Sequence, residues 1–82
     1  MADVTYYVAL SFVMSDDGPA AREGVECPSA SAAILRAERL AITEGNIGAV
    51  AFSRTGDPAL GDFSDAVVLR AFGEVPTDLS AL

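Results

Sequence analysis

Side chains at the start of the chain alternate between two faces. Between Val4 and Met14 one set of alternate positions is wholly apolar: Val4, Tyr6, Val8, Leu10, Phe12 and Met14. The positions between them are only weakly polar: Thr5, Tyr7, Ala9, Ser11 and Val13. A period of two, carried by β-branched and aromatic residues, is typical of a strand. We predict a strand here, with the wholly apolar set facing the core.

Two further apolar runs flank the turn-like segment DPALGD at 57–62. Pro58 presets φ at the start of a turn, and Gly61 can adopt a positive φ. We therefore predict a long β-hairpin from Asn46 to Gly73, closed by a four-residue loop from Pro58 to Gly61.

A loop of this length fixes the pairing of the two hairpin strands, because Asp57 must then lie opposite Asp62. The expected pairs along the ladder are Gly56–Phe63, Arg54–Asp65, Ser53–Ala66, Phe52–Val67, Ala51–Val68, Val50–Leu69, Ala49–Arg70 and Ile47–Phe72. Opposite charges at Arg54 and Asp65 favour this register. Phe63 is expected to cover the bare backbone of Gly56.

A helical pattern occupies Pro28 to Glu44. Pro28 suits the first turn of a helix, the serines after it can cap the N-terminus, and Gly45-Asn46 is a stop signal. Six residues form one apolar stripe: Ala30, Ala33, Ile34, Ala37, Leu40 and Ala41. A second apolar edge consists of Leu35 and Ile42. The wedge expected to face solvent consists of Arg36, Arg39 and Thr43.

The polar segment from Ser15 to Glu26 interrupts these patterns. Turn-forming residues lie at both of its ends: Asp16-Asp17 and Gly18-Pro19 at the start, and Gly24 near the end. We interpret it as a connector that is long for a compact domain, either a loose loop or a mobile flap over a site.

The order of elements predicts an α+β fold of the type β-α-β-β. We expect a three-stranded, mainly antiparallel sheet with one helix packed on one face, and a right-handed crossover that makes the first two strands parallel. Either the third or the second strand lies in the centre; Gly48 and Gly56 favour an edge position for the second strand and so a central third strand. Residues 1–82 form a single domain, with residues 74–82 as a frayed tail and one short helical turn beginning near Thr77.

The charge of the chain limits its partners. Twelve acids and five bases give a net charge of −7, which disfavours nucleic acids and anionic membrane surfaces. No apolar run is as long as a membrane span, and the start lacks the basic segment of a signal peptide. These features predict a soluble cytoplasmic protein.

Few residues suggest chemistry. The chain has one cysteine, Cys27, and no histidine, so we predict no catalytic residues, no metal site and no cofactor. The hairpin-tip aspartates Asp57, Asp62 and Asp65 are interpreted as turn formers. Two candidate binding residues remain, Tyr7 and Arg70, because a mid-strand guanidinium needs a carboxylate, a ligand anion or the carbonyls of a partner.

A single helix covers only one face of a sheet, so the other face is expected to self-associate. The predicted self-association surface contains Ile47, Ala49, Ala51, Val68 and Phe72. The resulting hypothesis is a homodimer acting as a non-enzymatic binding or regulatory module. The alternative is a small-molecule carrier or small enzyme whose pocket forms between subunits, lined by Tyr6 or Tyr7, Arg70 and a carboxylate.

Two segments also carry a resemblance. AFSRTGDP at 51–58 and VLRAFGEVP at 68–76 resemble a group of short acidic bacterial proteins to which no function is assigned. The resemblance implies a bacterial source and no particular activity. The predicted topology is also similar to half of a ferredoxin-like domain, a fold that hosts many unrelated functions.

Overall fold

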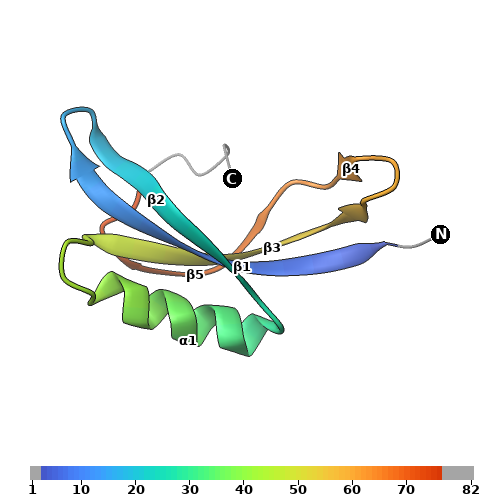
Figure 1. Ribbon diagram of the computed structural model, residues 1–82, viewed down its shortest axis with the longest axis horizontal. Coiled ribbons are helices and arrows are strands. Elements are labelled where there is room, and N and C mark those ends of the chain that lie inside the picture. Colours follow the sequence, from blue (N-terminus) through green and yellow to red (C-terminus); the bar gives the residue numbers. More distant parts are fainter. Residues whose placement is uncertain (1–2, 77–82) are drawn as a thin grey trace.

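The computed structural model describes residues 3–76 and shows an α+β fold with one helix and an antiparallel sheet (Figure 1). The elements in order are β1 (Val4–Ser15), β2 (Gly18–Cys27), α1 (Ala30–Ala41), β3 (Gly48–Asp57), β4 (Asp62–Phe63) and β5 (Val67–Gly73). The sheet runs β2-β1-β3, and both β4 and β5 pair with β3. It bends into a half-barrel, with α1 on one side and both hairpin tips rising on the other.

The segment predicted as a connector is the strand β2, so neither a loose loop nor a flap forms there. A tight turn at Asp16-Asp17 joins it to β1, with Gly18 at φ +103° and the Ser15 hydroxyl donating to the Gly18 carbonyl (2.6 Å). Gly, Pro and charged residues suggested a loop, but they are also what an edge strand tolerates.

This extra strand corrects the predicted topology. Because β2 returns the chain before the helix, β1 and β3 are antiparallel, and α1 connects β2 with β3 across β1. The central position also belongs to β3, the second predicted strand, which lies between β1 and β5. A Cβ at Gly48 would collide with the Glu74 backbone, and one at Gly56 with that of Asp62. These glycines therefore mark close backbone approach, not a sheet edge.

The hairpin register is confirmed at its tip. Asp57 lies opposite Asp62, Gly56 lies opposite Phe63, and the Phe63 ring covers the glycine. The Asp57 carbonyl accepts the N–H groups of Leu60 (3.1 Å) and Gly61 (2.9 Å).

Beyond the tip, the predicted register is wrong by one residue and then by two. Residues 64–66 leave the ladder, so the predicted Arg54–Asp65 pair does not form within it. A second shift at Leu69 follows. The observed pairs are Ser53–Val67, Phe52–Val68, Ala51–Arg70, Val50–Ala71, Ala49–Phe72 and Gly48–Gly73. Such irregularities accommodate the bend of the strand.

The helix forms where predicted, with closer bounds. Ser29 is the N-cap, and its hydroxyl accepts the Ala32 N–H (3.1 Å). After Ala41 the chain turns through Gly45, whose φ is +93°, and the Asn46 side-chain amide donates to the Leu40 carbonyl (2.9 Å). Ser29 is thus the predicted serine cap. Pro28 precedes this cap and so does not lie in the first turn as predicted, and the helix ends at Ala41, three residues before the predicted end at Glu44.

The prediction of which sheet face the helix covers is wrong. Ala33 and Ala37 of α1 pack on Ala9, Ala49 and Ala51, and all five are 0% exposed. Alanines on both partners let the helix approach the sheet closely. The larger apolar residues lie in a second cluster: Phe12, Val50 and Phe52, with Val8, Leu10, Ile47, Ala66 and Val75 packed around them.

The predicted self-association surface changes accordingly. Ala49 and Ala51 are buried beneath α1, and Phe72 packs against the same cluster. Ile47 is half-buried in the second cluster, whereas Val68 remains 42% exposed. These residues therefore do not form one uncovered face.

The predicted helical turn near Thr77 and most of the predicted frayed tail fall at 77–82, outside the described residues. Among residues 3–76, no helix has the length and apolar character needed to cross a membrane.

Candidate functional site

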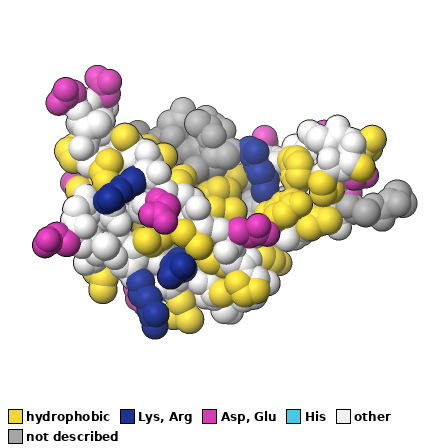
Figure 2. All heavy atoms as spheres, in the orientation of Figure 1, with side chains coloured by type: hydrophobic (Ala, Val, Ile, Leu, Met, Phe, Trp, Pro, Cys, Tyr) yellow, Lys and Arg dark blue, Asp and Glu magenta, His cyan; other side chains and the backbone are white. Residues whose placement is uncertain are grey.

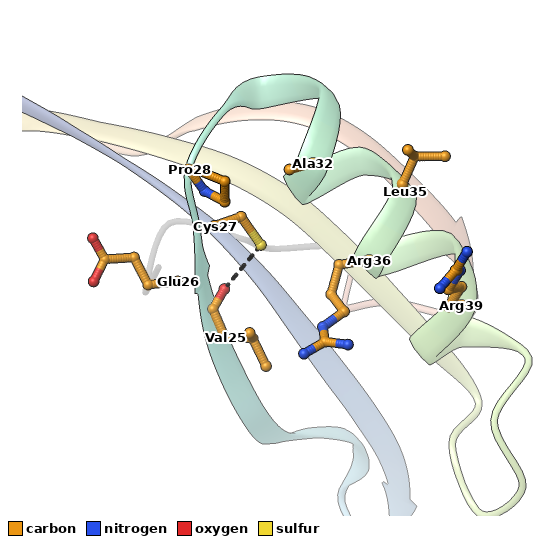
Figure 3. Close-up of a pocket in the computed structure, with 8 residues that line it drawn as sticks. All are labelled: Val25, Glu26, Cys27, Pro28, Ala32, Leu35, Arg36 and Arg39. Atoms are coloured by element: carbon orange, nitrogen blue, oxygen red, sulfur yellow. Dashed lines mark hydrogen bonds between the residues drawn. The ribbon is translucent and has the colours of Figure 1, made fainter.

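A pocket lies between the C-terminal end of β2 and the flank of α1 (Figure 3). Its volume is about 340 Å³, and its lining residues are Val25, Glu26, Cys27, Pro28, Ala32, Leu35, Arg36 and Arg39. The pocket forms because α1 packs mainly on β1 and β3 and leaves the edge strand β2 with little helix cover.

Most of the pocket wall is apolar. Val25 and Cys27 come from β2, Pro28 from the β2–α1 junction, and Ala32 and Leu35 from the first two turns of α1. Leu35 is 58% exposed, so much of its side chain remains open to solvent beside the pocket. The predicted second apolar edge of the helix thus borders the pocket through Leu35.

Two arginines supply the positive charge of the pocket. Arg36 extends from α1 toward Val25 on β2, and Arg39 lies one turn further along the helix. No acid among residues 3–76 forms an ion pair with either guanidinium. Glu26 points to the other side of β2, away from both arginines. Figure 2 shows two basic side chains close together near α1, with apolar side chains around them.

Cys27 lies in the pocket wall and is 9% exposed. Its thiol donates a hydrogen bond to the Val25 carbonyl (Sγ–O 3.5 Å). A carbonyl cannot accept the thiol proton outright, so this contact does not activate a nucleophile. Cys27 is therefore placed as a structural thiol of the core.

The two residues predicted to bind a ligand lie apart. Tyr7 on β1 is opposite Cys27 and Ser53, and its half-buried side chain packs against the alanine cluster. Arg70 is exposed on β5 opposite Ala51, with β3 between it and β1. Tyr7 and Arg70 thus lie on two strands, β1 and β5, that do not pair with each other.

Tyr6, the other tyrosine considered for a pocket, packs against an aromatic ring. Its ring centroid lies 5.8 Å from that of Phe63, in a tilted arrangement. Aromatic pairs of this geometry stabilise sheets. Tyr6 thus stabilises the end of the β3–β4 hairpin, where the Phe63 ring covers Gly56.

The aspartates at the hairpin tip are placed by the turn. Asp57 accepts the Ala59 N–H on its carboxylate (2.9 Å), as a turn-forming aspartate does. Within residues 3–76, His, Cys, Asp and Glu nowhere gather in groups of three that could hold a metal ion.

The two sheet edges differ in character. The edge strand β2 carries Pro19, Arg22 and Glu23, which hinder pairing with another strand. In β5 the sequence is VVLRAFG, with one charge. Val67 is 60% exposed and Val68 42%, so β5 presents an apolar edge.

Sequence reasoning missed the pocket because it missed β2. Arg36 and Arg39 were assigned to a solvated wedge, which is correct for their exposure. Only the return of the chain along β2 places Val25 and Cys27 beside them. The exposed Leu35 next to Arg36 was the available signal.

Comparison of the chain with known proteins adds no information about this pocket. Searches of protein-family models, curated protein sequences and solved structures gave no significant match to the chain. The resemblance to short acidic bacterial proteins therefore stays a prediction.

Proposed function

We propose that the protein is a non-enzymatic, homodimeric binding module of the bacterial cytoplasm, with its two subunits joined along β5. The observation that carries this proposal is the apolar edge of β5, which within residues 3–76 has one charge and no proline, whereas the β2 edge has a proline and three charges.

An open edge strand offers a row of backbone N–H and C=O groups to another chain. Proteins suppress unwanted pairing with charges, proline or irregular backbone. Within residues 3–76, β5 pairs only with β3, and Arg70 is its one charge. Two-fold symmetry, the commonest in oligomers, would place two β5 strands antiparallel.

The chemistry of the pocket supports binding over catalysis. Its one nucleophile, Cys27, contacts a carbonyl, and the chain contains no histidine to act as a base. A single free thiol also suits the reducing cytoplasm better than an oxidising compartment.

Sedimentation equilibrium at micromolar concentration tests the dimer. We expect a dimer for the wild type and a monomer for Val67→Lys, because a lysine on β5 would hinder strand pairing. Ala21→Lys on β2 is the matched control and should remain dimeric. A monomeric wild type, or loss of the dimer only in Ala21→Lys, would contradict the proposal.

The second candidate function, a small-molecule carrier, is favoured by the pocket at β2 and α1. That pocket belongs to a single subunit, so the carrier would not need Tyr7 and Arg70 to meet across an interface.

A further inference from the structure

We propose that the pocket between β2 and α1 binds a small organic carboxylate with an apolar body. The carboxylate would pair with Arg36, with Arg39 at the outer rim, and the apolar body would lie on Val25, Pro28 and Leu35. This proposal goes beyond the dimer and does not depend on it, because every lining residue belongs to one subunit.

The charge of the ligand follows from the two arginines. In a chain of net charge −7, arginines would be expected to have acidic neighbours, yet none among the described residues pairs with Arg36 or Arg39. Arg22, in contrast, donates to the Asn46 side-chain oxygen (3.1 Å). Residues three apart on a helix lie on one face, so both guanidiniums can reach one anion. The planar guanidinium fork matches a carboxylate geometrically.

The body of the ligand follows from the rest of the lining. Five of the eight lining residues are apolar: Val25, Cys27, Pro28, Ala32 and Leu35. A small inorganic anion would leave this apolar surface exposed to water. An aliphatic chain would cover it, and the burial of apolar surface would favour binding. The volume of about 340 Å³ lies within the range of roughly 300–1,000 Å³ typical of small-molecule sites.

The position of Glu26 removes the obvious competitor for the arginines. Glu26 lies between Val25 and Cys27 in the pocket wall, but its side chain points away from α1. Cys27 also lines the pocket. Its rate of alkylation can therefore report on binding, because a ligand in the pocket would shield the thiol.

Octanoate is the probe of choice, titrated into the full chain by amide NMR. Octan-1-ol, which lacks the charge, and inorganic phosphate, which lacks the chain, are the matched probes. Iodoacetamide labelling of Cys27 gives a second readout. Arg36→Gln and Arg39→Gln remove the proposed contacts. Arg22→Gln removes the same charge on strand β2, outside the pocket lining, where Arg22 donates to the Asn46 side chain.

We expect octanoate to shift the amide signals of Val25 to Cys27 and of Ser29 to Ala32, and to slow Cys27 alkylation. It should bind at least about tenfold more tightly than either matched probe. Arg36→Gln should weaken octanoate by about tenfold, the loss of one charge-assisted contact. Arg39→Gln should weaken it less, and Arg22→Gln should leave it unchanged.

Three results would overturn the proposal: no shifts at these amides with millimolar octanoate, equal binding of octanol or phosphate, or equal loss in all three variants. Thermal melts establish that each variant is folded. The Val67→Lys chain should keep octanoate binding whether or not it is monomeric, so the outcome for the pocket is separate from that for the dimer.

Discussion

Replacing Gly48 with alanine tests the central position of β3 directly. Gly48 is buried between Phe12 of β1 and Gly73 of β5, and a Cβ there would meet the backbone of Glu74. The obstacle is backbone, which cannot rotate away as the end of a side chain can. Either the β3–β5 pairing or the chain after Gly73 must shift.

The change in folding stability caused by Gly48→Ala can be compared with that caused by a second glycine substitution, Gly24→Ala. Overpacking a closed site costs about 1–3 kcal/mol, and we expect Gly48→Ala to destabilise by about 2 kcal/mol. At Gly24 the added methyl would lie 3.7 Å from Leu10 Cδ1 and Val8 Cγ1, an ordinary contact. Gly24→Ala should therefore stabilise the fold by about 0.5 kcal/mol through the entropy of the unfolded chain.

Thermal unfolding at one fixed protein concentration separates the two variants. For a domain of this size, 1 kcal/mol shifts Tm by roughly 4–8 °C. Gly48→Ala should lower Tm by roughly 8–16 °C, and Gly24→Ala should raise it by roughly 2–4 °C. Equal shifts, or a neutral Gly48→Ala, would refute the close approach and with it the central placement of β3.

Three further substitutions test local features by thermal or denaturant unfolding. Ser29→Ala removes the helix N-cap and should cost about 1 kcal/mol, whereas Ser31→Ala, inside the helix, should be neutral. Ser11→Ala should cost about 1 kcal/mol, because the buried Ser11 hydroxyl accepts the Glu23 N–H (3.2 Å) at the β1–β2 irregularity. Ala37→Leu should cost about 1–3 kcal/mol by forcing α1 off the sheet, a loss that an exposed-face substitution would not produce.

The hairpin tip and the helix were predictable because local chemistry dictates them. Pro58 and Gly61 restrict the turn whatever surrounds it. Ser29 caps the start of the helix in the same way, and Gly45 turns the chain after the helix has ended at Ala41. The register beyond Phe63 was not predictable, since the shifts at residues 64–66 and at Leu69 follow from the bend of the whole sheet.

Strand β2 was missed because its residues are ambiguous at the level of sequence. Gly18, Pro19 and Gly24 signal a loop when their neighbours are unknown, and an edge strand when β1 is available for pairing. This one error reversed the direction of β3 relative to β1. It also concealed the pocket, because three of the eight lining residues lie on β2.

The assignment of faces failed for a different reason. Ranking residues by hydrophobicity placed the helix on Val8, Phe12 and Phe52, the bulkiest face. A helix with an alanine stripe fits best against an equally small surface, and that surface is Ala9, Ala49 and Ala51. Size complementarity between the two partners decided the packing, and it is visible only when both elements are compared.

This packing bears on the proposed dimer. Alanine removes little apolar area from water, so the close α1–sheet interface contributes less hydrophobic energy than a leucine-lined one of the same length. The second cluster around Phe12, Val50 and Phe52 must supply much of the remainder. Val68 lies opposite Phe52 at the border of that cluster and is 42% exposed. A partner strand along β5 would cover it, extending the larger core at the place where the subunit leaves it open.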